Sequence, residues 1–162
     1  RPVSSAASDV YKRQVKIGKG RIIKRGKDLA ILALGTRVGS ALKVADNLLQ
    51  DNLKITVADA RFAKPIDTEL LEKLWNEHQK LIIIEEGSAG GFSSHCLHFL
   101  SSKGLLNKPD KEIKCLTMPD NFQDHASQNE QLAKAGLDTD GLMKVVAKMI
   151  SMSDTKNKSI AN

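Results

Sequence analysis

Aromatic residues are scarce in this sequence: they make up 4% of its 162 residues, with one tryptophan, Trp75, and one tyrosine, Tyr11. A surface that stacks the bases of single-stranded nucleic acid needs several aromatic side chains, so such a platform is excluded. Cysteine is as rare, because Cys96 and Cys115 are the only two, too few for a disulfide framework and suited to a reducing compartment. No apolar run approaches the roughly 20 residues that a membrane-spanning helix needs.

The charge is unevenly distributed along the sequence. Residues 1–27 contain nine Lys/Arg and one acidic residue, Asp9, whereas residues 28–162 contain 16 Lys/Arg and 18 Asp/Glu. The net charge of +6 therefore comes from the leading segment, and the rest is mildly acidic. A charge run of this kind is usually a solvated face. We expect neither nucleic acid nor a membrane among the partners.

The two ends differ from what lies between them. The sequence begins with Arg1 rather than Met, which indicates a fragment or a processed product. Residues 1–14 are polar and aperiodic, and we interpret them as a non-native or disordered leader, with an acid-poor transit remnant as the alternative. Residues 152–162 are predicted to be a disordered tail. One domain with a sizeable core is expected over 15–151.

Between these ends, apolar runs alternate with segments of helical periodicity. Runs such as Asp28–Leu34 and Leu81–Ile84 are almost wholly apolar, as in strands that are covered on both faces. The predicted strands are 21–26, 28–34, 55–59, 81–84 and 113–118, and the predicted helices begin near 36, 67, 92, 127 and 138. Thr36 can cap the first of these helices, Ser127 and Glu130 form a capping-box pattern on the fourth, and Asp138 or Thr139 caps the last. This order predicts an α/β fold: a three-layer α/β/α domain with a five-stranded, mostly parallel sheet. The first strand has no helix before the second, so we expect it to be antiparallel at an edge.

The exit of the third strand is the strongest candidate for a contact with an anion or another domain. Arg61 and Lys64 place positive charge where the strand emerges, and sites in open α/β sheets form at such strand ends. Asp67 is a good N-cap for the following helix. In the structural alternative, Arg61 bonds Glu85, Glu86 or a backbone carbonyl.

The next strand ends in Glu85-Glu86 and a glycine-rich turn, Gly87–Gly91. Adjacent residues on a strand point to opposite faces, so the two carboxylates are poorly placed to share a proton as an acid/base pair. Alternatively one caps the glycine turn and the other forms a salt bridge at an interface. This turn and Gly35-Thr36 could each present N–H groups to an anion, or could be sharp turns only.

Two clusters contain histidine. His95, Cys96 and His98 share a helix, but no third or fourth ligand stands at a recognised metal-site spacing, so a packed helix face is the better interpretation. Asp124-His125 lies in the loop after the last strand, where His125 could reach a neighbouring subunit or could be held by its own Asp. We predict no catalytic, cofactor-binding or metal-ligating residue. Arg61, Lys64, Glu85, Glu86 and His125 are predicted as interface or interdomain residues.

Several of these segments together resemble a known family. In order they are Ile17–Gly20, Ala30–Thr36, Asp59–Asp67 (DARFAKPID), Glu85–Phe92, Met118–Asp120 and Asp124-His125. They are similar to the C-terminal (third) domain of 1-deoxy-D-xylulose-5-phosphate synthase, over about Ile17 to Ile150. The Arg-Phe-x-Lys-Pro-x-Asp wording is the most discriminating part. Ala126 stands where many relatives have glycine.

The resemblance implies a homodimeric thiamine-diphosphate enzyme that also needs Mg²⁺. It would condense pyruvate with glyceraldehyde 3-phosphate, release CO2 and supply isoprenoid precursors, and in bacteria also thiamine and pyridoxal. In such enzymes the cofactor-binding GDG…N motif and the catalytic residues belong to the first two domains, and none has a counterpart here. The resemblance therefore implies an inactive fragment with structural, interdomain and dimer contacts, cytoplasmic in a bacterium or in the stroma of a plastid. Alternatives are a stand-alone module that binds an anion, or the same domain of a transketolase or of a pyruvate dehydrogenase beta subunit.

Overall fold

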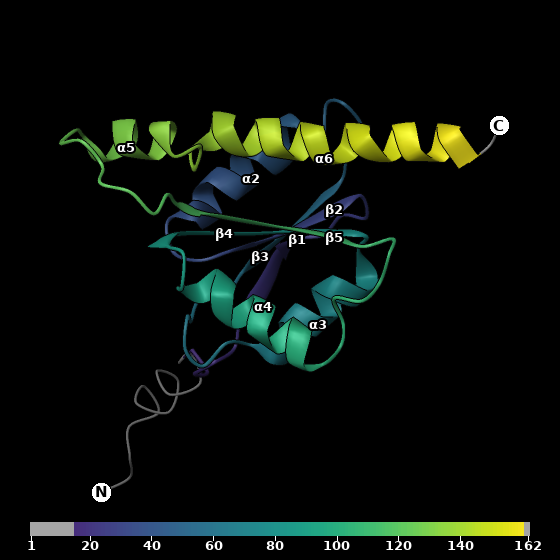
Figure 1. The fold of residues 1–162 in the computed structure, drawn as a ribbon, viewed down its shortest axis with the longest axis horizontal. Helices are drawn as coiled ribbons and strands as arrows, with labels where there is room; N and C mark the ends of the chain where they lie inside the picture. The colour runs from purple at the N-terminus through teal and green to yellow at the C-terminus, as the bar shows by residue number, and fades with distance from the viewer. Residues whose placement is uncertain (1–14, 161–162) are drawn as a thin grey trace, which may run out of the picture.

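The fold is a five-stranded sheet between two layers of helices (Figure 1). The computed structural model describes residues 15–160, with side chains as far as Ser151. The strands are β1 (Arg21–Lys24), β2 (Leu29–Ala33), β3 (Ile55–Asp59), β4 (Lys80–Ser88) and β5 (Glu112–Met118). The helices are α2 (Arg37–Asn47), α3 (Thr68–Glu77), α4 (Phe92–Ser102), α5 (Gln128–Lys134) and α6 (Thr139–Ile160).

The sheet has the order β1-β3-β2-β4-β5. β2 pairs in parallel with β3 and with β4, and β4 pairs in parallel with β5. β1 pairs with β3 in the antiparallel direction and lies at the edge. The predicted fold class is confirmed. Its physical basis is that β2, all of whose residues are buried, needs a covering layer on both faces.

Each face of the sheet has its own apolar core. Ile31 and Ile82 point to the face covered by α2, α5 and α6, and their strand neighbours Leu32 and Ile83 point to the face covered by α3 and α4. The alternation follows from the two-residue period of a strand. The only tryptophan, Trp75, is 1% exposed in the second core. No helix in the described part of the chain is long and apolar enough to cross a bilayer.

Most of the predicted helix ends are confirmed. The Asp67 carboxylate accepts from the N–H of Leu70 and caps α3. Ser127 and Glu130 form a complete capping box on α5, and hydrogen bonds from Ser127 lower the pKa of the Glu130 carboxyl. Asp138 accepts from the N–H of Gly141 at the start of α6.

The N-terminus of α2 corrects one expectation. Thr36 occupies the N-cap position, but its side chain makes no capping hydrogen bond to the helix. Its hydroxyl donates instead to Glu86 on β4. Thr36 also has αR dihedral angles instead of the extended ones typical of an N-cap, and its hydroxyl oxygen accepts from the Arg37 side chain.

The structure bears on only one of the two predicted disordered ends. α6 is helical as far as Ile160, whereas a disordered tail was expected from residue 152. The expected leader, 1–14, lies outside the described residues. The domain limits of 15 and 151 therefore stay predictions.

Candidate functional site

The carboxyl ends of β2 and β4 mark the position where sites form in this class of fold. After β2 the chain crosses to β3 on one side, and after β4 it crosses to β5 on the other. Loops that diverge in this way define the position of the crevice in which open α/β sheets commonly bind ligands. Gly35 and Thr36 border the crevice from β2, and Glu86 borders it from β4.

In this chain the crevice is closed by its own side chains. The Arg37 Nε lies 3.0 Å from Glu86 Oε1, and the Thr36 hydroxyl donates to the same oxygen. Arg37 Nη1 also donates to the backbone carbonyl of Leu137, at 2.6 Å, between α5 and α6. Arg37 is 8% exposed and Glu86 is one-third exposed. The arrangement ties α2 to β4 and to the α5–α6 junction.

A groove of about 600 Å³ opens next to this cluster. It lies between the first turns of α2 and the residues around both ends of α5, and Ser40, Lys43, Glu130 and Asp138 are among the residues that line it. Its charges are of both signs, and the carboxylates of Glu130 and Asp138 are already bonded to helix N-termini. The groove therefore has no consistent preference for an anion or a cation.

The glycine turn after β4 holds a carboxylate from the chain itself. Glu85 is 3% exposed, and its oxygens accept from the N–H groups of Phe92 and Ser93 at 3.0 and 2.7 Å. A Cβ atom at Gly87 or Gly91 would lie within 2.7 Å of Glu85 Oε2, so glycine is needed for the turn to close on this carboxylate. The anion-binding end of α4 is thus already occupied.

Glu85 and Glu86 point to opposite faces, as predicted. Glu85 reaches α4 and Glu86 reaches α2, so they cannot work as an acid/base pair. One carboxylate caps the glycine turn and the other forms a salt bridge, but this bridge lies within the domain. Whether Glu86 also faces an interface stays a prediction, and the Glu85 carboxylate is turned inward.

The strand exit after β3 is held by Asp59 and Asp67. Asp59 lies 3.3 Å from Arg21 and 3.8 Å from Arg61, and it accepts from the Arg61 N–H at 3.0 Å. Arg61 has a φ of 61°, which is uncommon for a residue with a side chain. Arg61 therefore forms its ion pair with Asp59 and not with Glu85 or Glu86, the two acids that the structural alternative named.

Asp67 joins this exit to the beginning of the domain. One carboxylate oxygen caps α3, and the other accepts from the Gly20 N–H at 3.0 Å. Lys19 adds ion pairs to Asp67, at 3.5 Å, and to Glu69, at 2.6 Å. Lys64 is exposed. The segment 59–67 thus connects the end of β3 to the start of α3 and holds residues 19–21 against them.

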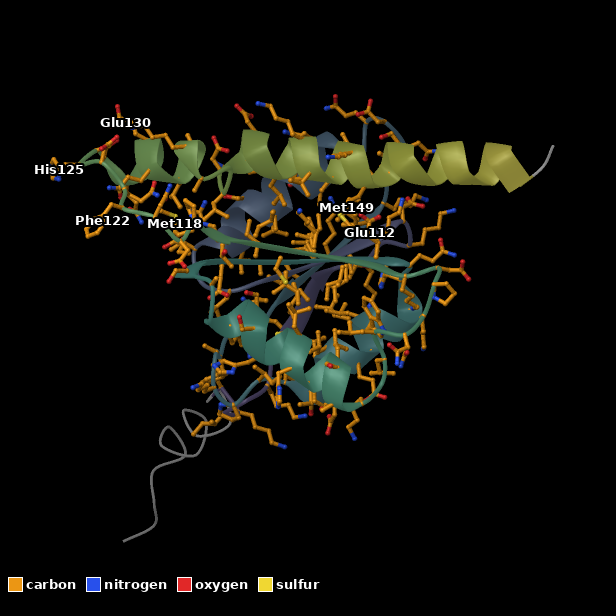
Figure 2. All side chains as sticks on the ribbon, in the orientation of Figure 1. Glu112, Met118, Phe122, His125, Glu130 and Met149 are labelled. Atoms are coloured by element: carbon orange, nitrogen blue, oxygen red, sulfur yellow. The ribbon has the colours of Figure 1, made fainter. Side chains whose placement is uncertain are left out.

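The histidine clusters do not form a chemical site. His125 is exposed, and in Figure 2 it points away from the body of the domain, as does Phe122. Cys96 is fully buried, and burial raises the pKa of its thiol to about 12, so it is not a nucleophile at neutral pH. Within the described residues, no group of three His, Cys, Asp or Glu side chains could hold a metal ion.

Comparison with known proteins gives the family. The sequence profile "Transketolase, C-terminal domain" matches residues 18–142, and the chain belongs to this family. A solved chain described as "Split gene transketolase, inactive beta4 tetramer" has the same fold, with a TM-score of 0.72 and 29% sequence identity. The match covers 85% of the present chain and 43% of the other, so this chain spans less than half of that relative.

Two features of this site could not be found from the sequence. Arg37 did not stand out, because its partners Glu86 and Leu137 lie 49 and 100 residues away. The Thr36 hydroxyl was assigned to its own helix for the same reason. The helical periodicity after Thr36 gave no signal for either contact.

Proposed function

We propose that this chain is the C-terminal domain of a 1-deoxy-D-xylulose-5-phosphate synthase. Its role is to hold the rest of a larger polypeptide and a second subunit in place. The observation that carries the proposal is the segment Arg61–Asp67, with the Arg-Phe-x-Lys-Pro-x-Asp wording of that family. The same segment fixes the first residues of the domain through Asp67 and Gly20.

The described residues do not fit thiamine diphosphate. Its diphosphate group needs N–H donors and a Mg²⁺ ion held by carboxylate or amide oxygens. The two glycine turns that could supply donors face Glu85 and Glu86, whose negative charges oppose a diphosphate. No metal-binding group of three acidic, His or Cys side chains occurs in the described region. We therefore propose that another part of the full polypeptide binds the cofactor and carries out every bond-making step.

Within that polypeptide the proposed reaction joins two carbons of pyruvate to glyceraldehyde 3-phosphate and releases the third as CO2. Thiamine diphosphate supplies the carbanion chemistry when it is bound. In our proposal this chain has a structural role only. The Arg37–Glu86 ion pair holds α2 against β4 at the carboxyl ends of the strands, and Asp59 and Asp67 hold residues 59–67 against the first residues of the domain.

A transketolase is the second candidate, because the solved relative is described as a split-gene transketolase. The two enzymes differ in the donor, since a transketolase transfers a ketol group and releases no CO2. The stand-alone anion-binding module has less support, because the chain's own carboxylates lie at both glycine turns and Arg61 pairs with Asp59.

The test is to clone and assay the whole reading frame that contains this chain. We expect a domain with a GDG…N motif in frame before Ile17, and we expect the purified polypeptide to form 1-deoxyxylulose 5-phosphate and CO2 from pyruvate and glyceraldehyde 3-phosphate. Ketol transfer from a ketose phosphate without CO2 would favour a transketolase. A start codon near Val15 would contradict the proposed synthase, because no thiamine-diphosphate domain would then precede this domain in the same polypeptide.

A further inference from the structure

The groove between α2 and the α5–α6 segment has the size of a small-molecule site. Its volume of about 600 Å³ lies within the range of pockets that hold such ligands. The first two turns of α2 form one wall, and residues 129–133 of α5 with 138–139 at the start of α6 form the other. The three helices cover the same face of the sheet (Figure 1), so the groove lies on that side of the domain.

The α2 wall carries positive charge. Arg37 lines it with a side chain that is only 8% exposed, and Lys43 lies almost two turns further along the helix. Each Nη atom of a guanidinium has two hydrogens, and Nη2 of Arg37 uses one of them, toward the Thr36 hydroxyl at 3.2 Å. The Ser40 hydroxyl accepts from Arg37 and can still donate. This wall therefore has donors left for the carboxylate of a ligand.

The opposite wall carries negative charge and has acceptors left. Glu130 uses Oε2 for both of its capping contacts with Ser127, and Asp138 uses Oδ1 for the Gly141 N–H. The other oxygen of each carboxylate accepts no hydrogen bond from a described residue. The Ser127 hydrogen bonds lower the pKa of the Glu130 carboxyl, so this wall keeps its charge at neutral pH. It can therefore bind the ammonium group of a ligand.

The two walls do not neutralise each other. Among residues 15–151 no salt bridge joins Arg37 or Lys43 to an acid across the groove. A ligand with charge of one sign would be attracted by one wall and repelled by the other. A ligand with both charges can be attracted by both walls at once.

We propose that this groove binds a small zwitterion of the class of free amino acids. The carboxylate of the ligand lies against Arg37 and Lys43, and its ammonium group lies against Glu130 and Asp138. The bound molecule connects α2 with the α5–α6 segment, in addition to the contact that Arg37 makes with the Leu137 carbonyl. The proposal does not depend on the reaction of the full polypeptide.

The test is an NMR titration of the ¹⁵N-labelled 162-residue chain with L-alanine, β-alanine and 4-aminobutyrate. These probes carry the same two charges at increasing separation. We expect at least one of them to bind saturably, with shifts concentrated at residues 36–43 and 129–139. Propionate and ethylamine, which each retain one charge of L-alanine, and butyrate and butylamine, which stand in the same relation to 4-aminobutyrate, should bind roughly tenfold more weakly or not at all.

Substitutions on each wall provide matched controls. Lys43→Gln should weaken binding of the best probe by roughly tenfold and leave the Tm unchanged, because Lys43 is exposed and has no salt bridge within the described region. Asp138→Asn should weaken binding similarly, because the amide can still cap α6 but has no charge. Lys144→Gln, at an exposed position of α6 outside the groove, should change nothing.

The outcomes are decisive for the groove. Absence of saturable binding for all three zwitterions overturns the inference, as do shifts that Lys43→Gln and Lys144→Gln change equally. Equal affinity for the zwitterion and its carboxylate analogue would show an anion site, and equal affinity for the amine analogue would show a cation site, and either result also overturns the inference. None of these results alters the test of the proposed function, which is the product formed by the full polypeptide.

Discussion

At the scale of residues, two glutamates fill the positions at which a domain of this fold could bind an anion. The N-terminus of α4 and the crevice beside α2 are positions where related folds hold anions. Here Glu85 occupies the first and Glu86 the second. Both glutamates belong to β4. Their carboxylates occupy the two positions at which a phosphate could otherwise bind.

Two glycine-to-alanine substitutions test whether the turn after β4 depends on the Glu85 carboxylate. Gly91→Ala places a Cβ atom 2.6 Å from Glu85 Oε2 and displaces the carboxylate from its two N–H donors. We expect the free energy of unfolding to fall by about 1–2 kcal/mol. Gly39→Ala, inside α2 with no atom within 4 Å of the new Cβ, should raise it by about 0.5–1 kcal/mol.

Urea unfolding followed by Trp75 fluorescence measures both variants, because the single tryptophan is buried. The difference in sign between the two glycines is the result to look for. Equal changes at Gly91 and Gly39 would mean that the turn does not depend on the Glu85 carboxylate.

Residues also show what the sequence could predict. Asp67 and the pair Ser127 and Glu130 were predicted as caps, because a cap and its helix are close in sequence. Arg37 was not, because its partners are distant in sequence and chosen by the fold. The structural alternative for Arg61 named Glu85, Glu86 or a backbone carbonyl as its partner, whereas its ion pair is with Asp59, two residues away.

At the scale of elements, Arg37 joins three parts of the domain. The guanidinium is bonded to β4 through Glu86 and to the residue between α5 and α6 through the Leu137 carbonyl. A planar group with several donors can serve two acceptors at once, which a lysine cannot do as well. The α5–α6 segment therefore depends on α2 for its position as well as on the apolar core.

Replacement of Arg37 tests this coupling. Arg37→Leu removes the donor to Leu137 and leaves Glu86 without its guanidinium, so we expect a loss of about 2 kcal/mol in the free energy of unfolding. Arg37→Lys should recover less than half of that loss. Hydrogen exchange should increase at 135–139. The control is Lys24→Leu, which breaks the more exposed ion pair with Asp46 of the same helix and should cost roughly 0.5 kcal/mol. Losses of the same size at both positions would contradict the bridging role.

Elements were predicted well where burial sets the pattern. The apolar runs of β2 and β4 specify strands covered on both faces, and the antiparallel position of β1 follows from the missing helix between β1 and β2. Polar segments gave less information. The sequence of α6 beyond Ile150 has few apolar residues, so its periodicity did not predict a helix that continues to Ile160.

For the whole molecule, the family and the geometry both favour a structural role. The chain belongs to the transketolase C-terminal domain family. The solved split-gene transketolase chain is more than twice as long as the region that it shares with this chain. In the described residues the two glycine turns face carboxylates, and the thiol of Cys96 is buried and protonated at neutral pH. We therefore expect this chain to act by contact and not by chemistry.

The most direct test of that claim is turnover by the isolated 162-residue chain. Pyruvate, glyceraldehyde 3-phosphate, thiamine diphosphate and Mg²⁺ are supplied, CO2 and 1-deoxyxylulose 5-phosphate are measured, and calorimetry follows thiamine-diphosphate binding. We predict no product and no saturable binding, with both restored in the full polypeptide. Product formation by the isolated chain, or saturable cofactor binding that Arg37→Leu abolishes, would contradict the account and show that the crevice beside α2 is a site.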